Sequence, residues 1–418
     1  MLSNTRHILL VIAGVSMMLA LGASAQAPAT APASASAAQA PATPPAPADA
    51  TPPAPLSTFV LTGPLIWLPP ANFDAGPLGT LSVNGIITGY SVFQNNYVPG
   101  DANAQATLSN GEIFIQKASG IVQYYVQAGV YTMPTLGVPF VNAQNTVNNF
   151  YGPVPVAFLK FQAGKTTQFE IGQLPTLMGA ESTFTYQNFN IERGIVWNQE
   201  NAVNRGIQIN QTIGKYLSAA VSWNDGYYSD RYSWLSGSVT FTKGPHTLVY
   251  DGMGNMAQTA YETAATPIQN NGYMHAVIYT YTKGPWIISP YFQYGNLPFD
   301  PKVGVAKATS ATGGAFNLSY AFKSGFSLPV RVEYLTSSGS ATDGSVNMLG
   351  FGPGSGGFTF SATPTYQKGG MYLRADLSDV HATNYTPGSV FGTAGTDADQ
   401  FRGVLEFGFI FGKNVTEK

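Results

Sequence analysis

Cysteine is absent from the 418 residues of this chain, which excludes disulfides, thiolate catalysis and cysteine-ligated metal sites. Charge is scarce as well, because Asp, Glu, Lys and Arg make up only 10% of the residues, against roughly 25% in average globular domains. The formal net charge is −2, so no basic field exists that would attract nucleic acid. A chain with so little charge and 13% aromatic residues suits apolar surroundings.

Long apolar runs are missing after the N-terminal residues, so no membrane-spanning helix is expected in the later sequence. The N-terminus itself differs. Arg6 precedes an apolar stretch over residues 8–21, and Ala23 and Ala25 form an A-x-A site. This layout predicts a cleavable secretory signal over residues 1–25, and therefore export. The alternative, a membrane anchor helix, needs about 20 apolar residues, which is longer than this stretch.

Residues 26–57 are almost entirely Ala, Pro, Ser and Thr. They have too little large apolar surface to offset the entropy of ordering, so they predict an extended, disordered tether that could contact periplasmic or cell-wall components. Residues 58–78, which include LIWLPPANF, are more apolar and fit three roles: a first strand, a plug or a docking segment. At the other end, residues 413–418 form a short C-terminal tail.

Residues 79–412 alternate between apolar and polar side chains with a period of two, which predicts an all-β chain. In LPVRVEYL, Arg331 and Glu333 share one face, and in FRGVLEFGFIF, Arg402 and Glu406 oppose a row of phenylalanines. A soluble β-sandwich would alternate too. Here, however, aromatic side chains gather near strand ends, charged groups sit in mid-strand, and short and long connections alternate, as in outer-membrane barrels.

A Lys-Gly turn recurs along the chain and sets the strand count. TFTKGPHTLVYDG begins at Thr240 and TYTKGPWIISPYF at Thr280, and looser versions of the turn surround five other lysines, namely Lys117, Lys165, Lys215, Lys323 and Lys368. Seven such turns join fourteen strands, and one strand at each end makes sixteen. The predicted strands are 79–94, 111–117, 120–131, 153–163, 166–174, 203–214, 216–226, 231–243, 245–253, 272–283, 286–296, 309–322, 326–337, 355–368, 370–379 and 399–412.

Sixteen strands favour a closed transmembrane, antiparallel, up-and-down β-barrel with short periplasmic turns and long extracellular loops. Closure removes the two sheet edges, whose backbone groups cannot be left facing lipid. A cylinder of 16 to 18 strands is also wide enough for an aqueous channel. We therefore expect the chain in the outer membrane of a Gram-negative-type bacterium, in contact with outer-membrane lipid. Barrels of this size are typical of homotrimeric porins.

The stretches NGEIFIQKASGIVQYYVQAGVY, FLKFQAGKTTQFEIGQLPTLMGAES and NIERGIVWNQENAVNRGIQINQTIG resemble the putative bacterial β-barrel porin-2 family, also called OmpL-like porins. The resemblance covers most of the chain after about residue 79 and implies a passive outer-membrane channel. The last strand resembles the aromatic-terminated signal that the outer-membrane assembly machinery reads. The long Ala/Pro tether departs from the family pattern.

The third long connection, residues 175–202, looks like the pore-constricting loop of sixteen-stranded general porins. It would bring five charged residues into the pore: Glu181, Glu192, Arg193, Glu200 and, at the start of the next strand, Arg205. Acidic and basic groups that face each other would create a transverse field and orient polar solutes. The alternative is that these residues only pair with one another and fix an external loop.

Alternation also predicts the charged residues of the lumen: Glu112, Lys160, Glu170, Arg331, Glu333, Arg374, Asp376, Arg402 and Glu406. Four are positive and five are negative, so the sequence indicates weak charge selectivity with a slight preference for cations. The arginines and acids from residue 331 onward have a second interpretation, in which they brace the wall as cross-strand pairs.

Catalysis is not expected, since the mature chain has only His246, His275 and His381, at positions that scatter around the barrel. No Ser-His-acid site, paired-carboxylate site or metal-ligand spacing can be assembled from them. The sequence therefore predicts a porin for the passive diffusion of small hydrophilic solutes and ions, without enzyme activity, cofactor or metal. Two alternatives stay open: a sugar- or oligosaccharide-specific channel lined by Tyr125, Tyr131 and Trp234, and a non-conducting structural or adhesive barrel.

Overall fold

The computed structural model describes residues 63–257 and 268–413. The predicted signal over residues 1–25 and the predicted tether over residues 26–57 lie outside the described residues. So do residues 58–62 of the apolar segment and residues 414–418 of the tail. Within the described ranges, no helix is long and apolar enough to cross a membrane.

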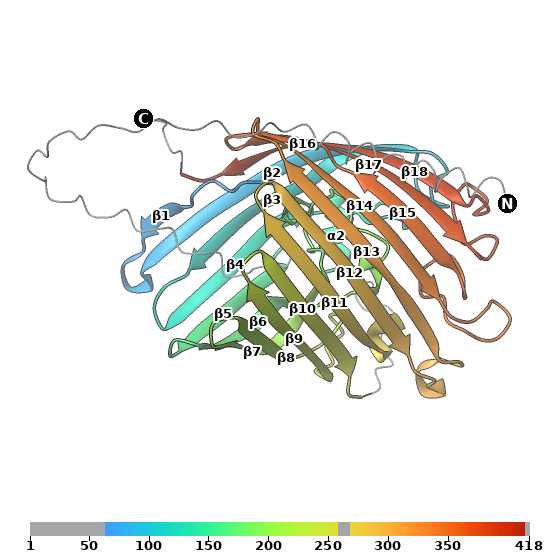
Figure 1. Cartoon of the computed structure of the whole chain (residues 1–418), viewed down its shortest axis with the longest axis horizontal. Helices are drawn as coiled ribbons and strands as arrows, with labels where there is room; N and C mark the ends of the chain where they lie inside the picture. Colours follow the sequence, from blue (N-terminus) through green and yellow to red (C-terminus); the bar gives the residue numbers. More distant parts are fainter. Residues whose placement is uncertain (1–62, 258–267, 414–418) are drawn as a thin grey trace, which may run out of the picture. The chain divides into compact units, whose positions relative to one another are not determined.

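The described residues form one antiparallel sheet, whose strands slant across the wall in Figure 1. The strands are β1 (Ala71–Asp74), β2 (Thr80–Gln94), β3 (Ala104–Lys117), β4 (Val122–Tyr131), β5 (Val156–Ala163), β6 (Thr167–Pro175), β7 (Val203–Ile213), β8 (Leu217–Asn224), β9 (Trp234–Lys243), β10 (His246–Asn255), β11 (Tyr273–Lys283), β12 (Trp286–Leu297), β13 (Thr309–Ala321), β14 (Phe326–Ser337), β15 (Gly356–Ala362), β16 (Thr365–Lys368), β17 (Met371–Thr383) and β18 (Asp399–Phe411).

The sheet closes on itself, because β18 pairs with β2 in an antiparallel register that places Glu406 opposite Tyr90. Eighteen strands are assigned, but β1 lies outside the ring, and β15 and β16 together make one wall strand, which leaves sixteen. Closure gives every wall strand a partner on both sides, so no edge is exposed to lipid. The predicted sixteen-stranded antiparallel barrel is confirmed.

All seven predicted Lys-Gly turns are present at one end of the wall, where they connect neighbouring strands. Three are two-residue hairpin loops, at residues 244–245, 284–285 and 369–370. Each turn contains a glycine with positive φ, a backbone conformation that residues with a Cβ atom rarely adopt. These glycines are Gly120 (87°), Gly164 (81°), Gly214 (66°), Gly244 (60°), Gly284 (58°), Gly325 (78°) and Gly369 (58°).

Most predicted strand ends agree with the observed ones to within four residues, and two strands differ by more. β3 begins at Ala104 and not at residue 111, because its small and polar start continues the backbone pairing with β2 as far as Phe93. The predicted strand 355–368 is interrupted between β15 and β16, where Pro364 lies. Proline has no N–H to donate to the ladder, and this explains the break.

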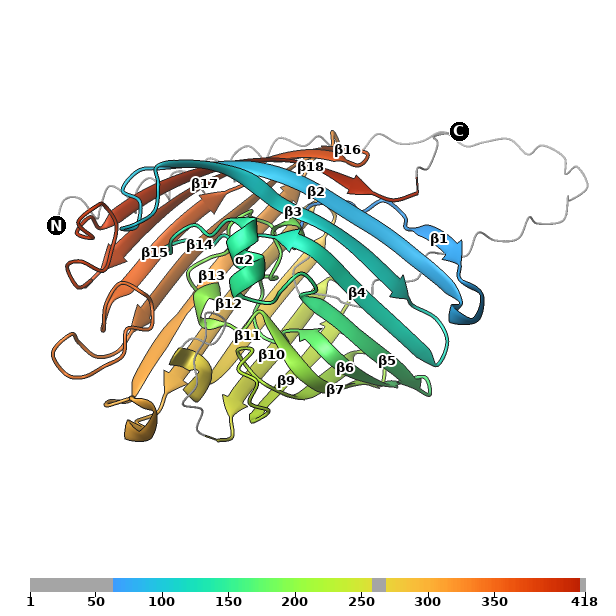
Figure 2. The same cartoon turned by 180° about the vertical axis from the view of Figure 1, so that it is seen from behind.

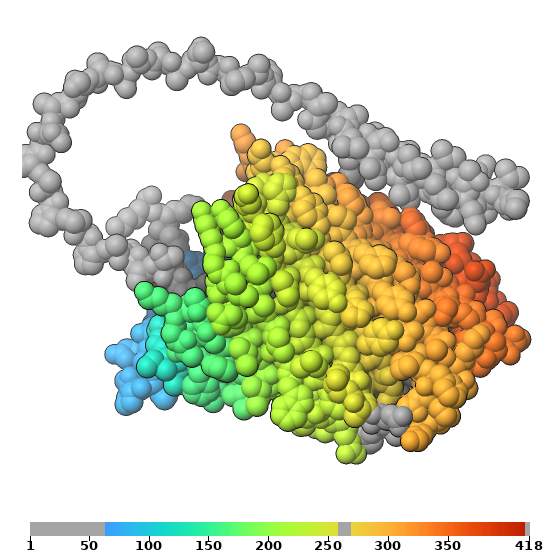
Figure 3. Space-filling model, turned by 60° about the horizontal axis from the view of Figure 1, so that its bottom comes forward, coloured from blue at the N-terminus to red at the C-terminus, as the bar shows by residue number. Residues whose placement is uncertain are grey.

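The two faces of the wall have opposite character. Large apolar side chains on the outer face are exposed, as expected for contact with lipid, and include Ile87, Ile113, Leu159, Ile171, Ile207, Val239, Val277, Phe316, Leu377 and Phe407. Figure 3 shows this face over β7 to β13, where neighbouring strands meet in a continuous surface. In β18, Phe407 is 51% exposed, whereas Arg402 and Glu406 are buried on the inner face as the alternation predicts.

Long connections join the strands at the end opposite the turns and contain the described helices. These are α2 (Ala143–Asn149) and the short 3-10 helices η3 (Thr185–Gln187), η4 (Trp197–Gln199), η5 (Ile268–Asn271) and η6 (Pro301–Val303), while η2 (Gly76–Leu78) lies between β1 and β2. α2 lies within the outline of the barrel in both views (Figure 1, Figure 2) and packs against β3 and β4. Two connections matter most for the site: residues 132–155, called the second loop, and residues 176–202, called the constriction loop.

β1 belongs to the apolar segment 58–78, for which the sequence left three roles open: a first strand, a plug or a docking segment. It pairs with the start of β2, on the same edge of β2 that β18 occupies further along, and so lies at the turn end of the barrel (Figure 1). This strand therefore supplements the ring and is not one of the sixteen. Residues 63–70 precede it and have no strand structure.

Candidate functional site

A row of charged side chains lines the inner face of β14, β17 and β18. Its members are Arg331, Glu333, Arg374, Asp376, Arg402 and Glu406, and all are almost completely buried. Arg374 and Glu406 are direct cross-strand partners, with 2.5 Å between Nη2 and Oε2. This pair has the wall-bracing geometry that the sequence offered as one interpretation.

The constriction loop covers this row and supplies many of its partners. Asp376 accepts hydrogen bonds through Oδ2 from the backbone N–H groups of Ile191 (2.7 Å) and Glu192 (3.0 Å). Glu333 accepts two more through its carboxylate oxygens, from the backbone N–H groups of Ile195 (3.1 Å) and Val196 (3.3 Å). Buried carboxylates require such charge-assisted partners, so the acids of the wall bind the backbone of the loop.

The arginines of the row bind the same loop as hydrogen-bond donors, whereas the carboxylates bind it as acceptors. Arg331 donates to the carbonyl of Glu192 (2.9 Å) and forms an ion pair with Glu181. Arg374 donates to the carbonyls of Thr185 (3.1 Å) and Asn188 (3.3 Å). Arg402 pairs with the carboxylate of Glu192 at 2.7 Å. The loop is thus docked along its length on the charged row.

Arg193 connects the constriction loop to the second loop. Its guanidinium donates to the carbonyl of Thr183 (2.5 Å) and to the hydroxyl of Thr135 (3.0 Å), and it stacks over Trp197 at 3.8 Å. The backbone N–H of Leu136 donates to the carbonyl of Arg193 at 3.0 Å. Both loops therefore fold into the barrel as one packed layer.

Gly194 shows how closely the loop approaches the wall. A Cβ placed on this residue would overlap the carboxylate of Glu333. The backbone N–H of Gly194 also donates to Oε2 of Glu181 at 2.8 Å. The glycine in the sequence IERGI is therefore required by a close approach of backbone to a buried carboxylate.

Burial controls the ionisation of the loop carboxylates. It raises the pKa of Glu192 and Glu181, and the nearby Arg402 and Arg331 respectively oppose that rise. Burial raises the pKa of Glu200 well above its usual range, and this carboxyl has no arginine partner in its hydrogen bonds to Tyr291 and Gln293. For Arg193, burial lowers the pKa to about 9, so the guanidinium remains charged at neutral pH.

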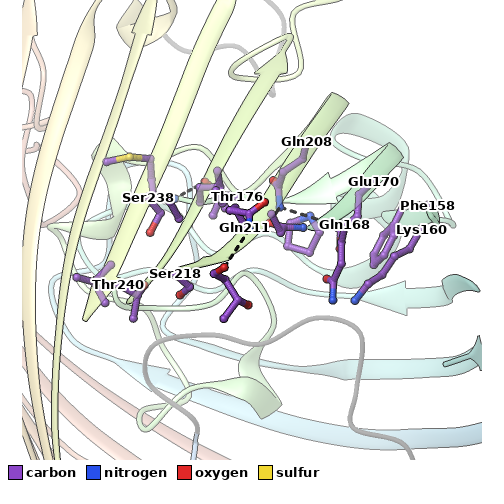
Figure 4. Close-up of a pocket in the computed structure, with 18 of the residues that line it drawn as sticks. Phe158, Lys160, Gln168, Glu170, Thr176, Gln208, Gln211, Ser218, Ser238 and Thr240 are labelled. Carbon is purple, nitrogen blue, oxygen red and sulfur yellow. Dashed lines mark hydrogen bonds between the residues drawn. The ribbon is translucent and has the colours of Figure 1, made fainter. Parts of the chain in front are cut away.

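A cavity of about 610 Å³ remains on the other side of the lumen, between the start of the constriction loop and β5 to β10. Half of the residues that line it have amide or hydroxyl side chains, among them Gln168, Gln208, Asn210, Gln211, Ser218, Ser238 and Thr240. Figure 4 shows Lys160 and Glu170 beside each other on one side, opposite Ser218, Ser238 and Thr240. The charged residues of the lining are Lys160, Glu170 and Glu181.

The structure places most predicted site residues at the cavity or in the packed layer, and Glu181 belongs to both, since it lines the cavity and pairs with Arg331. Lys160 and Glu170 are register partners on β5 and β6 and face the cavity. Glu192, Arg193, Glu200 and the six charged residues of the wall lie in the packed layer. Glu112 is also buried on the inner face, where its carboxylate accepts a hydrogen bond from Gln127 at 2.7 Å.

Arg205 does not join the other loop charges. It forms ion pairs at 2.7 Å with Asp225 and with Asp230, and its guanidinium stacks over Tyr228 at 3.8 Å. Together with Ile207 and Trp223 it borders a hollow in the outer part of the wall. The next long connection, residues 225–233, supplies its partners, and adjacency in sequence to the constriction loop could not reveal this.

Several side chains that hold the loops escaped the sequence analysis. Tyr291 and Gln293 of β12 bind Glu200, and Thr135 of the second loop binds Arg193. Alternation along YFQYG does place Tyr291 and Gln293 on the inner face, so part of the signal was available. The aromatic candidates Tyr125, Tyr131 and Trp234 are buried.

Each of the three histidines among the described residues has a different partner. His246 and His275 are exposed on the outer face, where each binds a tyrosine hydroxyl (Tyr279 at 2.7 Å and Tyr250 at 2.8 Å), and His381 pairs with Asp399. In this part of the chain, no three His, Asp or Glu side chains are close enough to hold a metal ion.

Comparison with known proteins finds a family whose sequence model matches this chain. The sequence model of the family described as "Putative beta-barrel porin-2, OmpL-like" matches residues 80–411. No curated protein sequence matches the chain.

Solved structures share the fold at low sequence identity. The anion-selective porin from Comamonas acidovorans is 10% identical with a TM-score of 0.55, and the match covers 79% of this chain and 99% of that one. The outer membrane channel DcaP of Acinetobacter baumannii is 12% identical with a TM-score of 0.53, covering 82% and 100%. OmpT of Vibrio cholerae in its trimer form is 11% identical with a TM-score of 0.50, covering 79% and 99%.

Proposed function

Since this chain belongs to the putative β-barrel porin-2, OmpL-like, family, we propose that it is an outer-membrane porin through which small hydrophilic solutes and ions diffuse passively. The observation that carries this proposal is the combination of a closed sixteen-stranded wall, apolar outside, with a cavity of about 610 Å³ lined by polar side chains. Passage by diffusion requires neither a cofactor nor catalysis.

Weak charge selectivity is the second part of the proposal. Most of the charged residues predicted for the lumen are paired within the packed layer, where their fields largely cancel. Lys160, Glu170 and Glu181 remain at the cavity, and Glu181 is neutralised by Arg331. A single facing Lys and Glu pair supports a pore with little preference for either sign.

A channel selective for neutral, hydroxyl-rich solutes such as sugars is the second candidate. It is favoured by the chemistry of the cavity, because amide and hydroxyl side chains outnumber charged ones in the lining. Such groups can exchange hydrogen bonds with sugar hydroxyls, whereas a general porin relies on charge.

Homotrimeric assembly and export through a cleaved signal complete the proposal. The OmpT structure supports the first, since an outer membrane protein of this fold has a trimer form. The layout of residues 1–25 supports the second. Contact of the tether with periplasmic or cell-wall components remains part of the same hypothesis.

Planar-bilayer recordings with the purified chain test the proposal. We expect discrete open steps at neutral pH in potassium chloride, and a heat-unfolded sample of the same preparation should give none. Liposome swelling with solutes graded by size and charge then separates the two candidates, because a sugar-specific channel would admit neutral sugars faster than amino acids of similar size. A folded barrel that gives neither steps nor swelling would contradict the porin hypothesis and favour a structural or adhesive role.

A further inference from the structure

Residues 63–70, called the strap, run across the turn end of the barrel before β1 begins. The strap is anchored at the rim by backbone groups: Asn84 donates to the carbonyl of Leu68 at 3.0 Å, and the N–H of Lys413 donates to the carbonyl of Pro69 at 2.7 Å. The side-chain amide of Gln367 binds both the N–H and the carbonyl of Ile66, each at 2.7 Å. Three separate segments, namely β2, β16 and the residues after β18, therefore hold the strap in place.

The inner end of the strap contacts the constriction loop directly. The N–H of Gly63 donates to the carbonyl of Gln187 at 2.9 Å. Trp67 packs edge-on against Tyr186 of the loop, with 5.6 Å between ring centroids, and against Phe114 of β3 at 5.3 Å. Leu65 is buried in the same apolar cluster as Tyr186 and Phe114.

These contacts reach part of the same loop segment from another side. The row holds residues 185–196 by polar contacts with β14, β17 and β18, whereas the strap contacts Tyr186 and Gln187 from the turn end, by ring packing and by one backbone hydrogen bond. Tyr186 is thereby enclosed by wall, loop and strap. A loop held from two sides has less freedom to leave the lumen than one held from a single side.

We propose that the strap positions the constriction loop within the pore, with Trp67 and Leu65 as the positioning side chains. This inference rests on the proposed function for its readout of conductance, but not for its readout of loop docking. The sequence left open whether this segment is a first strand, a plug or a docking segment. In this proposal residues 63–70 dock on the constriction loop and, with it, help to fill the pore.

The test replaces Trp67 by Ala in the full chain and compares it with Ile66→Ala. Ile66 is a matched control, because its side chain is 73% exposed and its hydrogen bonds use only the backbone. We expect Trp67→Ala to raise single-channel conductance and current noise, on the order of twofold, by releasing the loop from the pore. Ile66→Ala should match the unmodified chain, and Trp67→Phe should restore most of the original conductance.

Trypsin provides the second readout, since Arg193 is the one basic residue within the constriction loop. Cleavage there should accelerate in Trp67→Ala and not in Ile66→Ala. If Trp67→Ala does not assemble, as judged by heat-modifiable migration, Leu65→Ala takes its place. Equal conductance and equal protection of Arg193 in the two variants would overturn the inference. An unmodified chain that does not conduct would refute the porin function, while the protease comparison would still decide the role of the strap.

Discussion

Asp376 offers the sharpest test of whether the charged row docks the constriction loop. Replacing Asp376 by Ala removes the acceptor of two backbone N–H groups, those of Ile191 and Glu192. Both groups are buried, and each N–H left without a partner costs about 1–3 kcal/mol. The docked loop should lose about 2–6 kcal/mol, which raises the undocked population roughly 30-fold to 20,000-fold.

Limited proteolysis measures that population, because cleavage of a transiently opened segment follows its equilibrium opening. The rate of tryptic cleavage at Arg193 should rise by a factor in this range, while heat-modifiable migration shows that the wall is intact. Ser378→Ala is the control, since Ser378 lies on the same strand and inner face and binds Asp376 and Ser361 but not the loop. Cleavage of Asp376→Ala at the rate of Ser378→Ala would refute the reasoning.

Two further predictions concern charge in the pore. Replacing Glu170 by Gln leaves the positive charge of Lys160 unbalanced at the cavity, so the reversal potential in a salt gradient should shift toward anion preference. The same change at Glu112, which does not line the cavity, should leave the reversal potential unchanged. An equal shift in both variants would contradict the placement of Glu170 in the ion path. The raised pKa of Glu200 means that the docked state holds this proton more tightly than the undocked state, so docking should be strongest in acid and weaken as pH rises above the usual carboxyl range. Protection of Arg193 from trypsin, corrected for the pH dependence of the enzyme on an unfolded substrate, should therefore fall from pH 5 to pH 8. Glu200→Gln should reduce that fall, and the remainder comes from Glu181 and Glu192, whose pKa burial also raises. An unchanged fall in Glu200→Gln would contradict the role of Glu200.

The packed layer changes the meaning of the charged residues that alternation identifies. Arg331, Arg374 and Arg402 are buried on the inner face, and each also donates hydrogen bonds to the loops. Period-two alternation states which face a side chain occupies, but not what covers that face. The partners lie more than 130 residues away in the chain for Arg331 and Arg374, and no local pattern could join them.

Local backbone chemistry explains why the wall was predictable. The Lys-Gly turns need positive φ at glycine, and strands that are apolar on one face and polar on the other have few arrangements in lipid other than a closed ring. The split at Pro364 and the early start of β3 were missed because both depend on pairing with a neighbouring strand. Such pairing can extend a strand through residues with low β-propensity, and a missing N–H can interrupt a strand whose residues have high β-propensity.

The amino-acid sequence alone determined the strand number, the turn positions and the inward side of each strand, because these follow from residue-by-residue alternation and turn geometry. Only the tertiary structure decided what fills the barrel. The docking of residues 176–202 on the charged row, the hub at Arg193 and the contact of Trp67 with Tyr186 all join distant segments. Such contacts depend on shape and on the need to satisfy buried charges, and both arise from segments that the wall brings together and that no local pattern connects.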